Sequence, residues 1–161
     1  LVVGGGDTAV DAVIDAYNVT HDIWIVHRKD EFRAAETRVD SVVNEKMAEI
    51  LYNTELDEIR GNSEVEEVTL RNNQTKKTWN LAVDRVIIAV GLVPNNEVFN
   101  HLGLKMDGKF IVVDTEMRTN IEGVFAAGDI ISVYQLASVA AAQGALAAHN
   151  SYKYIRKPYW A

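Results

Sequence analysis

The sequence predicts an α/β protein, in which a parallel sheet and an antiparallel β-meander are followed by a second, partial domain. Short apolar runs alternate with segments of helical period over residues 1–55, which is the pattern of a parallel sheet with crossover helices. Over residues 68–83 apolar and polar residues alternate instead, as in antiparallel strands with one solvated face. The irregular stretch at residues 92–95 then separates these elements from an Ala-rich C-terminal segment.

The parallel part is expected to begin with a strand over residues 1–3. A helix from about Asp7 to Tyr17 follows, because the apolar residues there recur at the three-to-four spacing of one helical face. The apolar run 23–26 predicts a strand covered on both sides, and a second helix is expected over about residues 35–49. The buried face of that helix is expected to hold Val39, Val42, Val43 and Met47. Another strand is expected to begin at Ile50.

The alternating part predicts a hairpin or meander, with a polar turn at residues 72–74. Residues 86–90 predict a buried strand that ends at Gly91, where we expect a domain boundary. Since an irregular stretch follows, the elements after it belong to the second domain.

The second domain is expected to contain two strands, at residues 110–113 and 124–126. One helix is expected over about residues 136–155. Its many alanines permit a close approach to neighbouring backbone.

Composition excludes several classes of protein. The 161 residues are 48% apolar and carry a net charge of −7, which is unsuitable for general binding to nucleic acid. No apolar run approaches the ~20 residues of a membrane helix, so we expect no membrane association. The absence of cysteine excludes a disulfide scaffold, a thiolate zinc site and a Cys nucleophile within this chain. It also fits a reducing, cytoplasmic location.

Two further expectations concern metals and the start of the chain. His21, His101 and His149 lack the spacing of metal ligands, so no metal site is expected. The chain begins at Leu1, inside a predicted buried strand. We therefore expect it to be a piece of a longer protein.

A glycine-rich turn follows the first strand and opens the first helix. It matches G-x-G-x-x-A, in which the first Gly allows a tight turn, the second lets a pyrophosphate approach the backbone, and the small last residue lets helix and strand pack closely. The helix N-terminus offers free N–H groups to phosphates. The expected coenzyme-binding residues here are Gly4, Gly5, Gly6, Asp7, Thr8 and Ala9. A glycine-rich turn that binds nothing is the alternative.

The end of the second predicted strand decides between the two pyridine nucleotides. NAD-binding proteins of this Rossmann-like type place an Asp or Glu there to bind the ribose hydroxyls. This chain instead has His27, Arg28 and Lys29, with Arg33 shortly after. These cations suit the doubly charged 2′-phosphate of NADP. NADPH is therefore the expected coenzyme, although the adjacent acids of residues 30–31 could partly neutralise the cluster.

Two segments resemble the low-molecular-weight thioredoxin reductases. Residues 27–34, His-Arg-Lys-Asp-Glu-Phe-Arg-Ala, are similar to the H-R-R-D-x-F-R-A motif that binds the 2′-phosphate in that family. Residues 119–129 resemble the family's second flavin motif, which ends in Gly128 and Asp129. The resemblance implies that the Asp129 carboxylate contacts the ribityl chain of FAD, while a helix N-cap is an alternative role for it.

Further flavin contacts are implied by the same resemblance. The family often has Tyr-Arg-Gln-Ala at the start of the following helix, where this chain has Tyr-Gln-Leu-Ala at residues 134–137. Gln135 is expected to replace the family's Gln, and Leu136 and Ala137 to contribute backbone groups. The stretch that ends at Gly91 resembles the family's hinge into the flavin domain.

The resemblance implies an NADPH-binding domain over residues 1–90 and the C-terminal segment of an FAD-binding domain over residues 91–161. The implied activity passes hydride from NADPH to FAD and electrons on to a thioredoxin-like protein disulfide. No catalytic residue is expected in this chain, because the family's Cys-x-x-Cys and the N-terminal flavin half lie upstream of it. The family is also homodimeric.

Other functions remain open from sequence alone. A ferredoxin- or flavodoxin-NADP reductase has the same fold and lacks the cysteine pair. A redox-inactive dinucleotide-binding module is another alternative, and so is a structural fragment that binds nothing.

Overall fold

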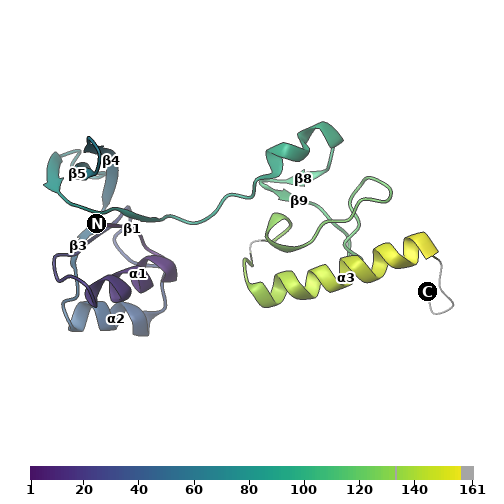
Figure 1. The fold of residues 1–161 in the computed structure, drawn as a ribbon, viewed down its shortest axis with the longest axis horizontal. Helices are drawn as coiled ribbons and strands as arrows, with labels where there is room; N and C mark the ends of the chain where they lie inside the picture. Colours follow the sequence, from purple (N-terminus) through teal and green to yellow (C-terminus); the bar gives the residue numbers. More distant parts are fainter. Residues whose placement is uncertain (133, 157–161) are drawn as a thin grey trace. The chain divides into compact units, whose positions relative to one another are not determined.

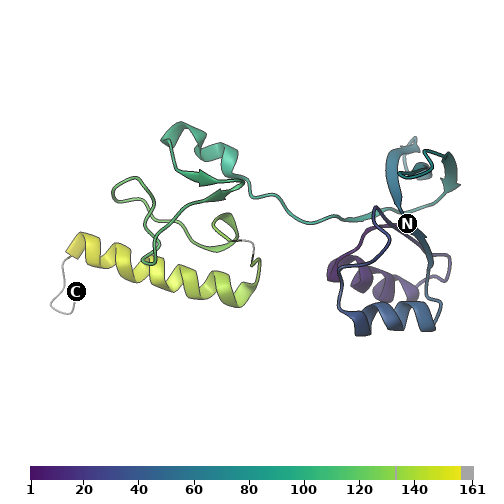
Figure 2. The same cartoon turned by 180° about the vertical axis from the view of Figure 1, so that it is seen from behind.

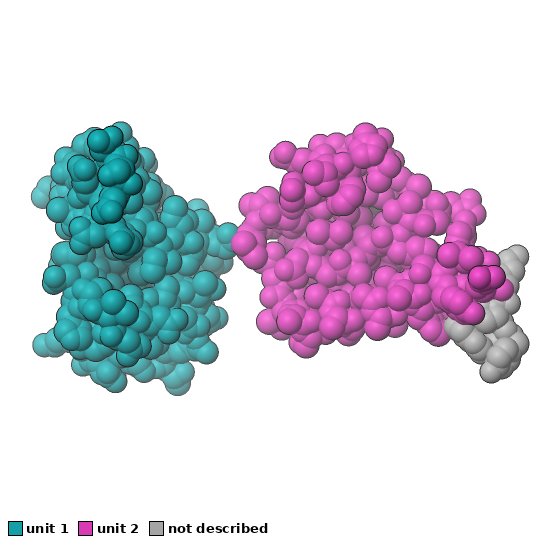
Figure 3. All heavy atoms as spheres, viewed as in Figure 1, with its two compact units in different colours: residues 1–91 teal, residues 92–161 magenta. Residues whose placement is uncertain are grey.

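The computed structural model describes residues 1–132 and 134–156. The chain divides into two compact units, Leu1–Gly91 and Leu92–Ala161 (Figure 3). Unit 1 contains β1 (Val2–Gly4), α1 (Asp7–Tyr17), β2 (Trp24–His27), α2 (Glu36–Asn44), β3 (Glu49–Tyr52), β4 (Thr54–Gly61), β5 (Val65–Asn72), β6 (Thr78–Ala82) and β7 (Ile87–Ala89). Unit 2 contains the 3₁₀ segment η1 (Asn96–Leu102), β8 (Met106–Asp107), β9 (Phe110–Ile111), the short 3₁₀ turn η2 (Gly128–Ile130) and α3 (Ala137–Arg156).

Unit 1 has three layers, and the middle layer is a parallel sheet of order β3-β2-β1-β7. Figures 1 and 2 show α1 and α2 on one side of this sheet and the meander strands β4 and β5 on the other. Side chains alternate between the two faces: Val2 and Ile25 pack with the helices, whereas Val3 and Val26 pack with the meander. The predicted parallel sheet with an added meander is therefore confirmed.

The helix α1 agrees with its predicted bounds, but α2 ends earlier than expected. Lys46 adopts a left-handed backbone (φ +52°), and the Met47 N–H then donates to the Val42 carbonyl at 3.0 Å, which closes the helix end. Met47 still packs beside Val42 in the core. Val43 is 47% exposed, so its predicted place on the buried face was wrong.

The meander sheet has the order β4-β5-β6, and its first strand was not predicted. The register of β4 against β5 shifts between Leu56 and Glu58, where an irregularity interrupts the two-residue period that identifies a strand. The predicted polar turn joins β5 and β6. Within it, the Oδ1 of Asn72 accepts hydrogen bonds from the backbone of Gln74 and Thr75.

The strand β7 lies at the edge of the parallel sheet and pairs only with β1 in the described part of the chain. Ile88 is 60% exposed and Val90 65% exposed. The prediction of a buried strand at residues 86–90 was therefore wrong for this structure, because one side of β7 carries no neighbouring strand.

In unit 2, the predicted helix over 136–155 is confirmed as α3. The predicted strand 110–113 is reduced to β9, which pairs with β8. Residues 124–126 do not form a strand: Phe125 makes an isolated bridge to Arg118. The chain turns at Gly123 (φ +78°), and the left-handed backbone of Met117 (φ +65°) interrupts the extended conformation of the opposite segment.

Candidate functional site

The glycine turn joins β1 to α1 with almost no space between neighbouring backbones. Gly4 has φ +152°, and a Cβ there would lie 2.3 Å from the Ala89 carbonyl oxygen and 2.9 Å from the Ala9 Cβ. Ala9 itself is fully buried. Only glycine fits at the first position, and the small residue at the last position allows the close helix packing that the motif predicted.

The middle glycine is required for a different reason. A Cβ on Gly5 would lie 2.3 Å from both Cε1 and Nδ1 of His27. The imidazole therefore packs directly on the turn, and it stacks on the Phe32 ring with centroids 5.5 Å apart. His27 links the end of β2 to the glycine turn, which its place before Arg28 and Lys29 in the sequence did not reveal.

The third glycine opens toward solvent. A Cβ on Gly6 would meet no atom within 4 Å, and Gly6 is the N-cap of α1 without a side-chain cap. Throughout the described residues, the backbone N–H groups of Gly6, Asp7 and Thr8 have no hydrogen-bond acceptor. The start of α1 thus presents free donors and the positive end of the helix dipole, as an anion site requires.

The loop after β2 is held in place through its backbone. The N–H of Arg33 donates to the Gly5 carbonyl at 2.6 Å, and the N–H of Ala35 donates to Oδ1 of Asp7 at 2.9 Å. Asp7 therefore holds the loop, a role that the sequence did not predict.

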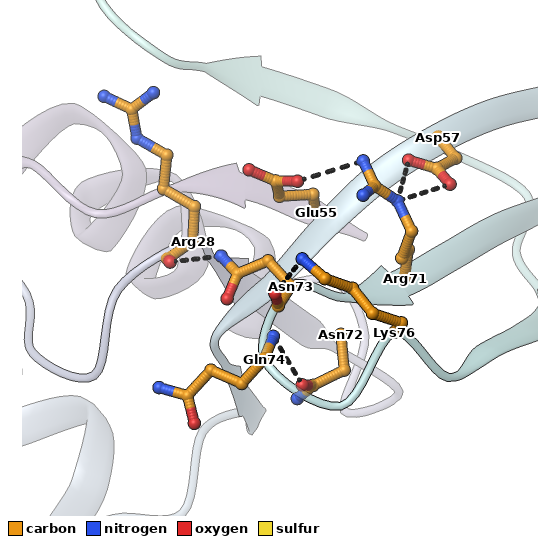
Figure 4. A network of polar contacts seen from close by, with 8 residues as sticks. All are labelled: Arg28, Glu55, Asp57, Arg71, Asn72, Asn73, Gln74 and Lys76. Carbon is orange, nitrogen blue, oxygen red and sulfur yellow. Dashed lines mark hydrogen bonds and ion pairs between the residues drawn. The ribbon is translucent and has the colours of Figure 1, made fainter.

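The same loop is fixed on its other side by two asparagines. The Asn53 N–H donates to the Lys29 carbonyl at 3.1 Å. The Asn73 side-chain amide donates to the Arg28 carbonyl at 2.6 Å (Figure 4). All of these contacts use main-chain atoms of the loop, so they do not occupy the side chains of Arg28, Lys29 and Arg33.

Arg28, Lys29 and Arg33 are exposed and carry no ion pair among the residues that the structure describes. The neighbouring Asp30 and Glu31 do not neutralise them by ion pairing. Four arginines elsewhere in the chain, Arg38, Arg60, Arg71 and Arg118, each pair with a carboxylate, whereas the cations of this loop do not.

A cavity of about 550 Å³ lies at the carboxyl ends of β1, β2 and β7. Its wall comprises Val3, Gly4, Gly5, Val26, His27, Arg28, Arg33, Thr54, Glu55, Leu56, Asp57, Arg71, Ile88, Ala89 and Val90. This is the edge at which open parallel sheets bind their ligands. The glycine turn and two of the predicted cations therefore face one space, whereas Lys29 lies outside its wall.

The surroundings of His27 favour its neutral form. Burial lowers the pKa of its imidazole below the usual value, and the positive charges of Arg33, Arg28 and Lys29 also lower that pKa, against a hydrogen bond with the Glu31 backbone that raises it. The side chain is 6% exposed, and its Nε2 has no hydrogen-bond partner. This nitrogen is buried, so the packing of the ring on the glycine turn leaves it without a partner among the described residues.

Unit 2 holds the second set of predicted residues. Gly128 has φ +83°, and its N–H donates to the Gln143 side chain of α3 at 2.9 Å. Asp129 is exposed and lies in η2, well before α3 begins, so the alternative role of capping that helix was wrong. Gln143, which the sequence analysis missed, positions the Gly128 backbone.

The remaining predicted residues lie at the start of α3 and at the end of unit 1. Gln135, Leu136 and Ala137 are exposed at the start of α3. Gly91 is exposed at the end of unit 1 and has φ +95°. A Cβ at Gly91 would meet open space, so its backbone conformation is what favours glycine there.

Within residues 1–132 and 134–156, no three His, Cys, Asp or Glu side chains are grouped as a metal site would require. No helix in the described part of the chain is long and apolar enough to cross a membrane.

Comparison with known proteins agrees with this geometry. Residues 1–144 match the family model "Pyridine nucleotide-disulphide oxidoreductase". The chain is 37% identical over 161 residues to a ferredoxin–NADP reductase of Ignicoccus hospitalis, covering 99% of this chain and 52% of the relative. It is 34% identical over 161 residues to a thioredoxin reductase of Peptoclostridium acidaminophilum, covering 96% of this chain and 51% of the relative.

The chain is also similar to solved structures of thioredoxin reductases. The crystal structure of thioredoxin reductase from Lactococcus lactis matches with a TM-score of 0.88 and 31% identity, over 98% of this chain and 52% of that one. The chain thus spans about half the length of the curated relatives that it matches. The resemblance to thioredoxin reductases is confirmed, and the chain belongs to the pyridine nucleotide-disulphide oxidoreductase family.

Proposed function

We propose that this chain supplies the NADPH site, and part of the FAD site, of an NADPH-dependent flavoprotein reductase. One observation carries the proposal: the glycine turn and the unpaired guanidinium groups of Arg28 and Arg33 face the same cavity. Residues 1–90 would form the NADPH-binding domain, and residues 91–161 would form the C-terminal segment of the FAD-binding domain.

The cavity, together with the start of α1 that follows Gly5 outside the cavity wall, suits the two charged parts of NADPH. The free N–H groups at the start of α1 suit the pyrophosphate, which can approach the backbone at Gly6 because no side chain is present. Arg28 and Arg33 suit the 2′-phosphate, with Lys29 contributing charge from outside the wall. No carboxylate stands at the end of β2, where NAD-binding sites hold the ribose hydroxyls.

The residues of unit 2 fit a flavin in part. The Asp129 carboxylate accepts no hydrogen bond within the described residues, so its oxygens can accept from ribityl hydroxyls. Gly128 is held against α3, where a Cβ would lie 3.6 Å from the Ala140 Cβ, and its φ of +83° favours glycine. Gln135, Leu136 and Ala137 would add contacts from the start of α3. The chemistry supplied by a bound flavin is two-electron exchange with NADPH.

The electron acceptor is proposed to be a thioredoxin-like protein disulfide. Similarity to thioredoxin reductases supports this choice, and the protein would then be a cytoplasmic homodimer whose redox cysteines lie outside this chain. A ferredoxin–NADP reductase is the second candidate, because a relative of that name from Sulfolobus acidocaldarius is 39% identical to this chain. Turnover of the full-length protein with NADPH, assayed on thioredoxin and on ferredoxin, distinguishes the two activities.

The NADPH site is tested by calorimetric titration of this chain with NADPH and with NADH. We expect NADPH to bind more tightly. Replacing Arg28 and Arg33 with Ala should weaken NADPH by about tenfold or more for each lost charge-assisted contact, and should leave NADH nearly unchanged. Arg85→Ala is the matched control, because Arg85 is a cation of unit 1 outside the cavity wall. Equal losses for both nucleotides would contradict the 2′-phosphate assignment.

A further inference from the structure

The wall of the coenzyme cavity contains two carboxylates that the phosphate assignment does not explain. Glu55 and Asp57 lie on β4, and both line the same cavity as Arg28 and Arg33. A doubly charged phosphate that binds near carboxylates is repelled by them, since the low dielectric of a cavity weakens screening. A site selective for NADPH therefore needs these two charges to be offset.

Arg71 on β5 offsets both of them. Its Nε donates to Oδ1 and Oδ2 of Asp57 at 3.0 and 2.9 Å, and its Nη2 donates to Oε2 of Glu55 at 3.2 Å (Figure 4). Glu55 and Arg71 are also direct cross-strand partners in the meander, so the backbone register holds this arrangement.

The arrangement also keeps Arg28 free. In Figure 4 the Arg28 guanidinium extends away from Glu55, and the drawn interactions do not join them. Oε1 of Glu55 has no hydrogen-bond partner in the described part of the chain. Without Arg71, the two carboxylates would repel an incoming phosphate and would compete with it for Arg28.

The formal charge of the cavity wall depends on Arg71. With His27 neutral, the wall carries the guanidinium groups of Arg28, Arg33 and Arg71 and the carboxylates of Glu55 and Asp57. Its formal charge is therefore +1, and removal of Arg71 would bring it to zero. A dianionic group is affected by this change far more than the neutral 2′-hydroxyl of NADH.

We propose that Arg71 is a positioning residue that sets the selectivity for NADPH over NADH, by neutralising Glu55 and Asp57 rather than by touching the coenzyme. The inference rests on the proposed function, because it takes the cavity to be the NADPH site. It assigns selectivity to a residue of the meander, outside both motifs that the sequence analysis identified.

The test is a set of charge variants of the whole chain, titrated with NADPH and with NADH at low and high salt. We expect Arg71→Met to weaken NADPH about tenfold and NADH by less than about twofold, with a smaller effect at high salt. Arg71→Lys should retain most of the NADPH affinity. Adding Glu55→Gln and Asp57→Asn to Arg71→Met should restore NADPH binding to within about threefold of the original chain.

The outcomes separate this inference from the proposed function. If the unmodified chain does not prefer NADPH, the proposed function fails. If it does prefer NADPH, but Arg71→Met weakens both nucleotides equally and the triple variant does not restore binding, Arg71 has only a structural role and the inference is overturned.

A second variant decides the matter if Arg71→Met does not fold. Glu55→Gln with Asp57→Asn leaves Arg71 in place and removes both negative charges. We expect this double variant to bind NADPH several-fold more tightly, with NADH almost unchanged. Unchanged NADPH affinity would overturn the inference.

Discussion

The contact between Gly5 and His27 leads to a sharp prediction about stability. Gly5→Ala would place a Cβ 2.3 Å from two atoms of the imidazole, whereas ordinary contact begins at 3.4 Å. The ring would have to retreat by about 1 Å, but it is buried and stacked on Phe32. We expect the variant to lose about 1–3 kcal/mol of unfolding free energy, the usual cost of overpacking.

The matched control is Gly6→Ala. Gly6 has φ −101° and open space at its Cβ position, so an alanine fits without strain. We expect the unfolding free energy to change by less than about 0.5 kcal/mol. NADPH affinity should nevertheless fall, because the added methyl group occupies the space proposed for the pyrophosphate. One glycine should thus affect folding, and the next should affect binding.

The assay is urea unfolding followed by tryptophan fluorescence. Trp24 and Trp79 both pack in the core between the sheet and the meander, and a Trp160→Phe background removes the tryptophan that lies outside the described residues. The same Gly5→Ala change is then made in a His27→Ala background, where the clash has no partner. Equal destabilisation in the two backgrounds would refute the role of the imidazole.

Three further predictions follow from other parts of the structure. The folded-state pKa of His27 lies below 6.5, so the unfolded chain takes up a proton that the folded chain does not. The unfolding free energy should therefore fall as the pH drops below about 6.5. The change in urea midpoint between pH 7.5 and 5.5 should be smaller in His27→Leu than in the original chain. Lys46→Gly should raise the unfolding free energy by about 0.5–1 kcal/mol, because Lys46 holds a left-handed backbone (φ +52°) at the end of α2; a lower urea midpoint would contradict this. Gln143→Ala removes the acceptor of the Gly128 N–H, so hydrogen exchange at that amide should accelerate about tenfold. Gln135→Ala is the control. An unchanged exchange rate in Gln143→Ala would show that this hydrogen bond does not protect the amide.

Local sequence patterns predicted much of the fold. The bounds of α1 agreed with prediction because its apolar period and its glycine start are both local signals. The end of α2 could not be predicted, since its closing residue is Lys46 rather than the glycine that usually marks a left-handed end. The strand β4 was missed because its register shift hides the alternation by which strands are recognised.

The motifs of the candidate site could be predicted from the sequence, but the contacts that hold its residues in place could not. Gly4 and Ala9 follow from a known spacing, and the cations follow from their place after β2. The contacts of His27 with Gly5, and of Asp7 with Ala35, join segments far apart in sequence. The same holds for Arg71, whose carboxylate partners come from another strand. Such contacts depend on tertiary packing, which one sequence without relatives does not reveal.

The hydrogen bonds that anchor the loop after β2 all use main-chain atoms on the loop's own side: the N–H groups of residues 33 and 35 and the carbonyls of residues 28 and 29. Substitutions at Arg28, Lys29 or Arg33 would therefore leave every anchor intact. Proteins descended from a common ancestor with this architecture could exchange one nucleotide for another through a few point mutations, without rebuilding the scaffold. For the protein engineer, these three positions form a compact library in which electron-donor preference can be varied at little risk to folding.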